Sequence, residues 1–569
     1  MNAAGVLVSC NEAGNKIPRR CSGIRLSRNW VLTTGSILSS FLQESTDENL
    51  TYWKNVSDVT YEDHLIRIKD RPFMETRVTF SVIASNATNT ANEITPTSKY
   101  LGFQEDTLIP VRNHQNKVMN SLAVAVDQPL SSDTHGKHKE FKSILKYAWR
   151  SQFVSHAVDT MLSSWVVGSI SYIENESSIE KESEITKNLL SLFLLLKLQT
   201  DDDESSEVSE YSELMDILRE MFEVEEEVLR RGQSVLVEST PFGNYYFHNS
   251  VSEGVVSNVF GPGRCLLLTD ASTALGCEGG PISVTVQKDG KLKRRLVGMV
   301  VCSLSWWRGE WVGFTMGVAL QPIVRRLLFP GAPVTSSPSL VPADTSPDQL
   351  AAVDECVVLV RCGVHWGSGV VVGSRDGIVL TCSHVVRHAR NDQAQVYWNN
   401  RAYTASVLFR SRDGFAYDVA VLRTGPGATF RPVNVSSKVA VKGEPVIAAG
   451  FSLFSEDDNV RPTVTRGIVT LASNPMAMLQ TTCCVQSGAS GGALFRYTGD
   501  LVGLISCNIM DTSTGALFPR INMAVPASVL AQPLNDFLRS GDVTFLSGME
   551  SKDPEVQRLW KLQSTISKL

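Results

Sequence analysis

Several features are scarce in this chain of 569 residues, and each scarcity excludes a class of protein. Positive charge is not in excess, because 53 Lys and Arg stand against 59 Asp and Glu, which leaves no basic field for nucleic acid. The apolar run 189–198 is far shorter than the roughly 20 residues of a membrane span, and Ser191 and Lys197 interrupt it. Cysteine and histidine pairs do not recur with the spacing of metal ligands. We therefore expect no metal, no cofactor, no nucleic-acid partner and no membrane span.

Cysteine is abundant but does not form the pattern of a disulfide framework. The chain has 11 cysteines, an odd number, and Cys483 and Cys484 are adjacent. Others, such as Cys302, Cys382 and Cys507, lie in apolar, strand-like runs. The apolar stretch 1–10 is too short for a secretory signal and is followed by polar residues. We expect free, buried thiols in an intracellular compartment.

The length of the chain, its short apolar runs and its turn residues predict two domains built from strands. Short apolar runs such as 369–372 and 439–441 lie near turn residues and indicate β-strands. The chain is longer than one hydrophobic core supports and fits two domains of about 200 residues with insertions. Residues 330–346 are rich in Pro and Ser and mark a boundary. We predict a first domain at 1–329, a linker at 330–350, a second domain at 351–545 and a tail at 546–569.

Three short segments of the second domain place His, Asp and Ser in one order. Thr381-Cys382-Ser383-His384 follows an apolar run, Asp418 precedes Val-Ala-Val-Leu, and Ser490 lies in the turn Gly-Ala-Ser-Gly-Gly at 488–492. This order, in strand-and-turn contexts, resembles the chymotrypsin-type serine peptidases. Alone, each residue also fits a structural role, as a core histidine, a strand-capping aspartate or a turn serine. Their joint occurrence predicts an active site.

The chemistry explains the residue types. A serine hydroxyl is a weak nucleophile at neutral pH, so Ser490 needs a base, for which we predict His384. Asp418 is predicted to fix the histidine tautomer and to stabilise the imidazolium. The backbone N–H groups of Gly488 and Ser490 are predicted to stabilise the oxyanion.

The sequence of the first domain resembles that of the second but lacks its predicted catalytic residues. Four segments match in the same order, and the first of them aligns Trp30-Val31-Leu32-Thr33 with residues 378–381. The alignment puts Ser36 in the place of His384, Ser121 in the place of Asp418 and Glu278 in the place of Ser490. Serine is no base at neutral pH, and a glutamate there would repel an oxyanion. We predict an inactive partner domain that packs on, shields or regulates the active one. The alternative is a different catalytic set within this half.

Residues 174–231 differ in composition from their surroundings. Asp201-Asp202-Asp203-Glu204 separates a leucine-rich run from an acidic, helix-like stretch. We interpret the segment as an acidic, helical insertion. Two interpretations stay open, a solvated and partly disordered insertion, or a helical hairpin that mediates self-association or regulates access.

The last three residues, Ser567, Lys568 and Leu569, form the tripeptide that the peroxisomal import receptor recognises. We expect a location in the peroxisomal matrix and the receptor as a partner.

The second domain resembles the HtrA/Deg branch of the trypsin-like peptidases through TCSHVV, YDVAVL and SGASGGAL. The whole chain is similar to peroxisomal, trypsin-domain-containing processing peptidases, through its inactive first copy, active second copy and SKL end. The resemblance implies an all-β fold of tandem double β-barrels. It also implies removal of a thiolase leader, internal cuts in fatty-acid β-oxidation enzymes, self-cleavage, self-association and cleavage after cysteine. We expect no PDZ module of the kind typical of HtrA proteins after Val525.

Three functions compete: a limited-processing endopeptidase, which the intact triad favours, a peptidase-like binding or chaperone protein, and a quality-control protease. Cys484 lies six residues before Ser490, at the base of the pocket for the side chain that precedes the cut. It offers no carboxylate to Lys or Arg, and an unpaired buried cation costs several kcal/mol. A small or apolar residue is therefore expected there. Alternatively, Cys484 only packs behind the pocket.

Overall fold

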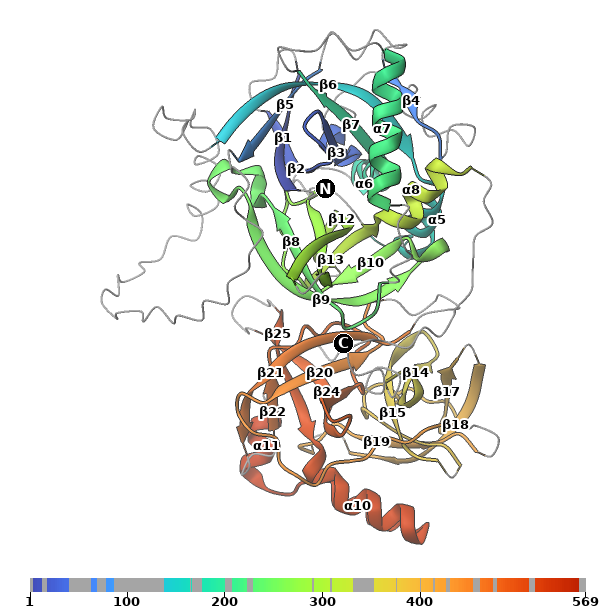
Figure 1. Cartoon of the computed structure of the whole chain (residues 1–569). Helices are drawn as coiled ribbons and strands as arrows, with labels where there is room; N and C mark the ends of the chain where they lie inside the picture. Colours follow the sequence, from blue (N-terminus) through green and yellow to red (C-terminus); the bar gives the residue numbers. More distant parts are fainter. Residues whose placement is uncertain are drawn as a thin grey trace, which may run out of the picture.

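The described residues form three closed six-stranded β-barrels and one seven-stranded sheet, six strands of which close into a fourth barrel, with two barrels in each half (Figure 1). This computed structural model describes residues 4–12, 18–39, 63–68, 78–85, 138–163, 165, 176–199, 207–222, 229–288, 291–307, 310–330, 353–374, 376–399, 401–412, 415–425, 430–453, 461–473, 478–510 and 517–561. The predicted fold class, tandem double barrels of the trypsin type, is confirmed. Ser121, the linker at 331–350 and the terminal tripeptide lie outside the described residues.

The first barrel belongs to the N-terminal half. Its strands follow the order β4-β6-β5-β1-β2-β3-β7, and β6 also pairs with β7, which closes the ring. The strands are β1 (Ala4–Glu12), β2 (Arg19–Arg25), β3 (Trp30–Thr34), β4 (Ile66–Arg67), β5 (Val78–Ser85), β6 (His138–Arg150) and β7 (Leu192–Leu198).

The second barrel is closed in the order β10-β13-β12-β11-β8-β9. Its strands are β8 (Ser234–Ser239), β9 (Ser250–Phe260), β10 (Leu266–Thr269), β11 (Pro281–Lys288), β12 (Lys291–Trp307) and β13 (Glu310–Ala319). The helix α8 (Leu320–Leu328) follows β13 and buries Ile323 and Val324 on one face.

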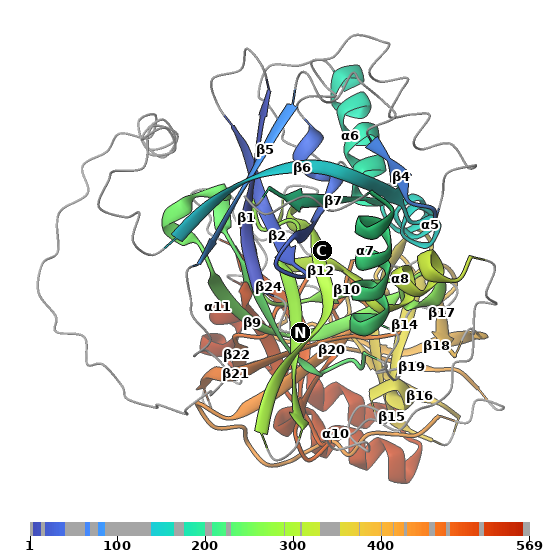
Figure 2. The same cartoon turned by 45° about the horizontal axis from the view of Figure 1, so that its top comes forward.

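The segment predicted as an insertion is in part a barrel element, which corrects the boundary 174–231. Within it lie two helices, α6 (Glu176–Leu190) and α7 (Glu207–Phe222), but between them runs β7, whose seven side chains are all buried. A continuous leucine run is a strand here because it fills a barrel wall between β3 and β6. Figure 2 shows α6 and α7 along one side of this barrel.

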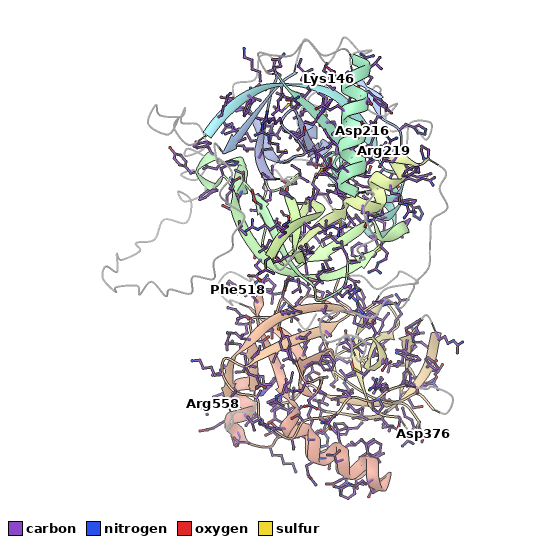
Figure 3. The ribbon with its side chains drawn as sticks, viewed as in Figure 1. Lys146, Asp216, Arg219, Asp376, Phe518 and Arg558 are labelled. Atoms are coloured by element: carbon purple, nitrogen blue, oxygen red, sulfur yellow. The ribbon has the colours of Figure 1, made fainter. Side chains whose placement is uncertain are left out.

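Helix α7 is fixed to the barrel by charge as well as by apolar packing. The Glu210 carboxylate accepts from Lys197 Nζ at 2.7 Å and lies 3.1 Å from Lys146 Nζ. Lys146 is labelled beside this helix in Figure 3. Leu214 and Leu218 are fully buried in the adjacent core. The apolar face of α7 is therefore covered within the chain.

The C-terminal half contains the other two barrels, in the orders β14-β15-β16-β19-β18-β17 and β20-β21-β22-β25-β24-β23. The strands are β14 (Val357–Cys362), β15 (His365–Gly373), β16 (Ile378–Thr381), β17 (Gln393–Trp398), β18 (Arg401–Arg410), β19 (Ala420–Arg423), β20 (Pro445–Gly450), β21 (Thr463–Ser473), β22 (Met478–Thr481), β23 (Ala493–Arg496), β24 (Leu501–Met510) and β25 (Leu517–Pro526).

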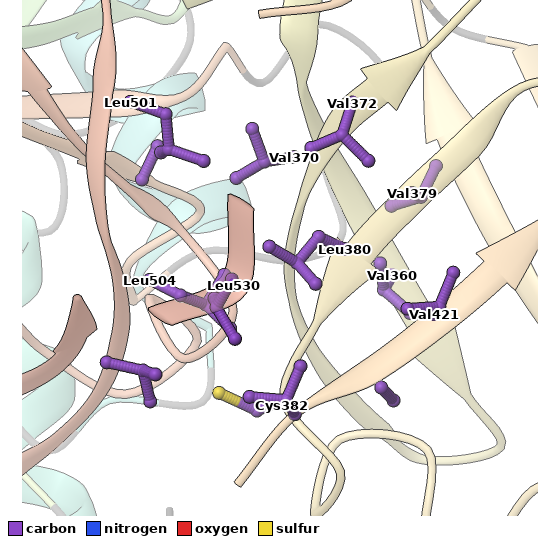
Figure 4. Packing of buried hydrophobic residues seen from close by; sticks show 14 of the residues in the cluster. Val360, Val370, Val372, Val379, Leu380, Cys382, Val421, Leu501, Leu504 and Leu530 are labelled. Atoms are coloured by element: carbon purple, nitrogen blue, oxygen red, sulfur yellow. The ribbon is translucent and has the colours of Figure 1, made fainter. Parts of the chain in front are cut away.

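One apolar core joins these two barrels. Val370 and Leu380 from the first barrel face Leu504 from the second and Leu530 from α10 (Ala527–Ser540), as Figure 4 shows. The tail then packs back: α11 (Pro554–Lys561) buries Trp560 against Tyr417, with ring centroids 5.8 Å apart. Part of the predicted tail 546–569 is thus integral to the second domain.

The two halves pack together through their second barrels. Strand β9 lies beside β21, and β13 lies beside β25. The Arg231 side chain, only 8% exposed, pairs with Asp354 and donates to the Pro462 carbonyl at 2.5 Å. Buried charge pairs of this kind fix a register between surfaces, since either charge left alone would be unfavourable.

All eleven cysteines are free, and all except Cys302 are buried, as the sequence predicts. Among the described residues, no helix is both long and apolar enough to cross a membrane.

Candidate active site

The strand pairing of the third barrel brings His384 and Asp418 together. His384 follows β16 and Asp418 precedes β19, and these strands pair with Thr381 opposite Ala420. Asp418 Oδ2 contacts His384 Nδ1, and Oδ1 accepts from the His384 backbone N–H at 2.9 Å. Both side chains are only 7% exposed. The carboxylate therefore holds the ring and the backbone of the same histidine.

Ser490 lies in a tight turn between β22 and β23. Its carbonyl accepts from Ser368 N at 2.8 Å, and Gly491 N donates to Ile505 O at 2.8 Å. Gly491 has φ +83°, and a Cβ there would lie 2.1 Å from the Ser368 carbonyl. Only glycine satisfies both conditions, which explains why the nucleophile position is followed by glycine.

The serine and the histidine are close to a triad but do not complete it. Ser490 Oγ donates to the Ser506 carbonyl at 2.9 Å. His384 Nε2 is buried and has no hydrogen-bond partner within the described part of the chain. A rotation of the Ser490 hydroxyl away from Ser506 is what the predicted hydrogen bond to His384 requires. Such bonds are often loose in a site without substrate.

Gly488, a predicted oxyanion-site residue, lies in a turn that buried hydrogen bonds hold in place. Gly488 has φ +89°, and its carbonyl accepts from Ser368 Oγ at 2.7 Å. The same hydroxyl accepts from Phe451 N at 2.8 Å, so one buried serine fixes two segments. Trp366 covers Gly488: a Cβ at Gly488 would lie 2.5 Å from the indole Nε1. This indole N–H has no hydrogen-bond partner among the described residues.

One group of side chains has the donor types of a metal site. Ligand atoms of Cys382, His384 and Asp418 all lie within 4.8 Å of one another. However, Cys382 Sγ donates to the Ile505 carbonyl at 3.3 Å, and Asp418 is engaged twice by His384. These contacts fit a histidine–carboxylate pair better than a metal ligand set.

The N-terminal half repeats the framework of this site bond for bond. Ser22 corresponds to Ser368, because Ser22 N donates to the Glu278 carbonyl at 2.9 Å and Ser22 Oγ donates to the Gly276 carbonyl at 2.9 Å. Thr33 Oγ1 donates to Ser22 O at 2.8 Å, as Thr381 Oγ1 donates to Ser368 O at 2.6 Å. This equivalence puts Ser36, two residues after the end of β3, where His384 stands.

The prediction for the aspartate position of the first copy is wrong. In the C-terminal half, Asp418 lies two residues before Ala420, which pairs opposite Thr381. In the N-terminal half, the residue opposite Thr33 is Leu194 of β7, so the aspartate position is Leu192. Leu192 packs against Gly35. A short Leu-Ala-Val match misplaced Ser121, because three residues do not fix a strand when the intervening segments differ in length.

Glu278 occupies the oxyanion position of its own copy. Gly276 N donates to Glu278 Oε2 at 2.7 Å. Burial raises the pKa of this carboxyl to about 7. Hydrogen bonds from the backbone N–H groups of Glu278 and Gly276 lower the pKa, but by less than burial raises it. The Glu278 side chain therefore occupies the position equivalent to the predicted oxyanion site of the second copy. When ionised, its negative charge would also repel a substrate oxyanion.

Cys484 faces the other half of the chain. It is buried, and its Sγ donates to the Gly313 carbonyl of β13 at 3.4 Å. Burial raises the pKa of the thiol to about 12, so it stays neutral. The adjacent Val485 N donates to Pro519 O at 2.9 Å, and Asn508 Nδ2 donates to Val485 O at 2.8 Å.

Sequence reasoning missed Ser368, Trp366 and Ser506. A signal for Ser368 exists, because Ser-Gly recurs at 22–23 and 368–369, before the matched strands of both copies. Nothing in the sequence singles out Trp366 or the Ser506 carbonyl.

The comparisons with known proteins agree with this geometry. Residues 367–504 match the trypsin-like peptidase domain family. Residues 367–504 therefore belong to a trypsin-like peptidase domain, which confirms the predicted enzyme class. Among bacterial relatives, the serine endoprotease DegS of Escherichia coli is 30% identical over 187 residues, 31% of this chain and 49% of that protein.

Two relatives align over much more of the chain. The peroxisomal leader peptide-processing proteases of mouse and human are each 35% identical, over 367 and 360 residues. The matches cover 60% and 59% of this chain, and the chain spans about 61% of the length of both relatives.

Solved structures give partial matches. The serine endoprotease of Yersinia pestis is 28% identical, with a TM-score of 0.28, over 34% of this chain and 66% of that chain. The HtrA-type protease AlgW is 23% identical, with a TM-score of 0.29, over 34% of this chain and 64% of that chain.

Proposed function

We propose that this chain is a peroxisomal serine endopeptidase that carries out limited processing of imported peroxisomal proteins. The observation that carries the proposal is the pair of contacts by which Asp418 holds His384, both buried, beside the glycine-bounded turn of Ser490. In this proposal Ser490 is the nucleophile, His384 the base and then the acid, and Asp418 the orienting carboxylate.

The reaction follows from these roles. Ser490 Oγ attacks the scissile carbonyl carbon, and its proton passes to His384 Nε2, whose lack of a partner leaves it free to accept. Asp418 stabilises the imidazolium, and the N–H groups of Gly488 and Ser490 stabilise the oxyanion. The C–N bond breaks as His384 protonates the leaving amine. Water, deprotonated by His384, then releases the acyl group from Ser490.

The names of the relatives favour leader removal as the physiological cut. In line with the family resemblance, we include a thiolase leader and internal sites in β-oxidation enzymes among the substrates, together with self-cleavage and self-association.

The pocket for the side chain before the cut is proposed to be neutral. Cys484 is an uncharged thiol, and Val485 and Asn508 lie next to it. Arg520 and Asp270 both act electrostatically on Cys484, and the effect of Arg520 is the larger. A Lys or Arg of the substrate would therefore find no net counter-charge, so a small or apolar residue, including cysteine, is favoured. A peptide library tests this, and dominant cleavage after Lys or Arg would contradict it.

The decisive experiment compares the full chain with Ser490→Ala. Both proteins are added to peroxisomal extract, and new N-termini are identified by sequencing. We expect a small set of new termini with the native chain and none with the variant, because removal of the hydroxyl deletes the nucleophile but leaves only a small gap. Processing by Ser490→Ala would exclude the proposal. Broad degradation instead of defined termini would favour a quality-control protease.

A further inference from the structure

The inactive half packs against the part of the active half where the loop from Cys484 to Ser490 begins. In Figure 3, Phe518 of β25 lies where the two halves meet. Strand β25 lies beside β13, and the loop from Cys484 to Ser490 begins at this boundary. The triad chemistry proposed above does not use any of these contacts.

One contact across this boundary joins Gly313 and Cys484. Cys484 Sγ donates to the Gly313 carbonyl, and Cys484 lies in one apolar cluster with Val312 and Phe314, the neighbours of Gly313. A Cβ at Gly313 would lie 2.8 Å from Cys484 Sγ and 3.3 Å from Pro519 Cγ. The first distance is shorter than carbon and sulfur allow, so β13 fits against this loop only through a glycine.

A second contact fixes the other wall of the same region. Arg520 Nη2 donates to the Asp270 carbonyl across the boundary. Asp270 is itself rigid, because it is 3% exposed and its Oδ1 accepts from Val255 N at 2.7 Å. Arg520 follows Pro519, whose carbonyl accepts from Val485 N. The inactive half therefore holds both Cys484 and the segment hydrogen-bonded to Val485.

We propose that the inactive half positions the specificity pocket of the active half, with Gly313 and Asp270 as its positioning residues. The inference rests on the proposed peptidase function and deepens it. Strand β13 sets the position of Cys484 and hence of Val485, while the Arg520–Asp270 contact sets the position of the Pro519 wall. The N-terminal copy thus determines which side chain is accepted before the cut, although it carries out no chemistry.

The test is a mutant cycle on the full chain. Gly313→Ala adds the methyl that collides with Cys484 Sγ, Cys484→Ala removes that sulfur, and the double variant combines them. Gly548→Ala is the matched control, because its Cβ also meets a proline, Pro533, at 3.1 Å, but within the C-terminal half alone. Each protein is assayed for fluorophosphonate labelling, for KM and kcat on a peptide series that varies the residue before the cut, and for thermal unfolding.

We expect Gly313→Ala to lower kcat/KM by about tenfold, mainly through KM, and to change the preferred residue before the cut. The double variant should recover most of this loss, and Gly548→Ala should equal the native chain. Arg520→Gln should also raise KM, while fluorophosphonate labelling at Ser490 persists.

Two failures are distinguishable. If the native chain is neither labelled nor cleaves peptides, the proposed function is wrong. If the native chain is active but Gly313→Ala retains its KM and its preference, the positioning role is wrong. A loss in Gly313→Ala that Cys484→Ala does not restore also overturns it, because the loss then does not act through the Cys484 contact.

Discussion

Gly276 donates its backbone N–H to the Glu278 carboxyl group at 2.7 Å, so this side chain of the first copy folds back onto its own turn. The equivalent turn of the second copy has Gly488 and Ser490 in these places and carries no such carboxylate. Because the hydrogen bonds of Ser22 and Ser368 are otherwise alike, the two copies differ in side chains rather than in framework.

The Glu278 site predicts a pH dependence of stability. Burial raises the folded-state pKa from 4.5 to about 7. The folded state therefore binds the proton more tightly, and the stabilisation from this group is full below pH 4.5 and lost as the pH rises through 7. Glu278→Gln is neutral at every pH, so its free energy of unfolding relative to the native chain should increase between pH 5 and pH 8. Urea unfolding at both values measures this, with the exposed Glu253→Gln as control. An equal difference at both values would contradict the assignment.

Restoring a serine in the first copy should not create activity. In a Ser490→Ala background, Glu278→Ser provides a hydroxyl, but Ser36 and Leu192 stand in the places of the base and the carboxylate. We expect fluorophosphonate labelling at the background level. Clear labelling of this variant would show that the first copy contains another catalytic set.

The contacts of Asp418 predict a graded loss in the triad. His384→Ala should reduce turnover about as far as Ser490→Ala, because the two act as a unit. Asp418→Asn should be severely impaired, by about 10⁴-fold in comparable triads, because the amide cannot hold the required tautomer while accepting the His384 N–H. Steady-state kinetics on one peptide substrate compares the three. Full turnover by Asp418→Asn would remove the carboxylate from the mechanism.

Trp560 is predicted to be essential for the second domain. It is 3% exposed, and its ring lies perpendicular to that of Tyr417, the neighbour of Asp418. Trp560→Ala should lower the free energy of unfolding by about 3–5 kcal/mol, as large-to-small core changes do, and should weaken labelling of Ser490. Denaturant unfolding measures the first effect. Val543→Ala, at an exposed position shortly before this tail, is the control and should stay near the native value.

The terminal tripeptide gives a test of location. Lys568→Glu in a fluorescent fusion of the full chain should leave the protein in the cytosol, because the receptor recognises the side chains and the carboxylate together. Lys561→Glu, on the preceding helix, is the matched charge change and should keep a punctate signal. Peroxisomal fluorescence of the Lys568→Glu fusion would require another signal.

The sequence by itself determined the peptidase class, the repeat and the strand character of both halves. These follow from local patterns: the order of His384, Asp418 and Ser490, the glycines of the turn, and short apolar runs between turn residues. Such patterns are readable because each one reflects a requirement within a few residues, such as the positive φ of Gly488 and Gly491.

The tertiary structure alone decided which distant segments share a barrel and which face each residue meets. The sequence pattern assigns residues 192–198 to an insertion, yet β7 closes the first barrel. This pairing places Leu192, rather than Ser121, at the position that corresponds to Asp418. The sequence predicts Cys484 as a pocket residue but gives no sign that its sulfur contacts Gly313, 171 positions away. Pairing across such separations depends on loop closure and on the packing of whole surfaces, neither of which leaves a local pattern in the sequence.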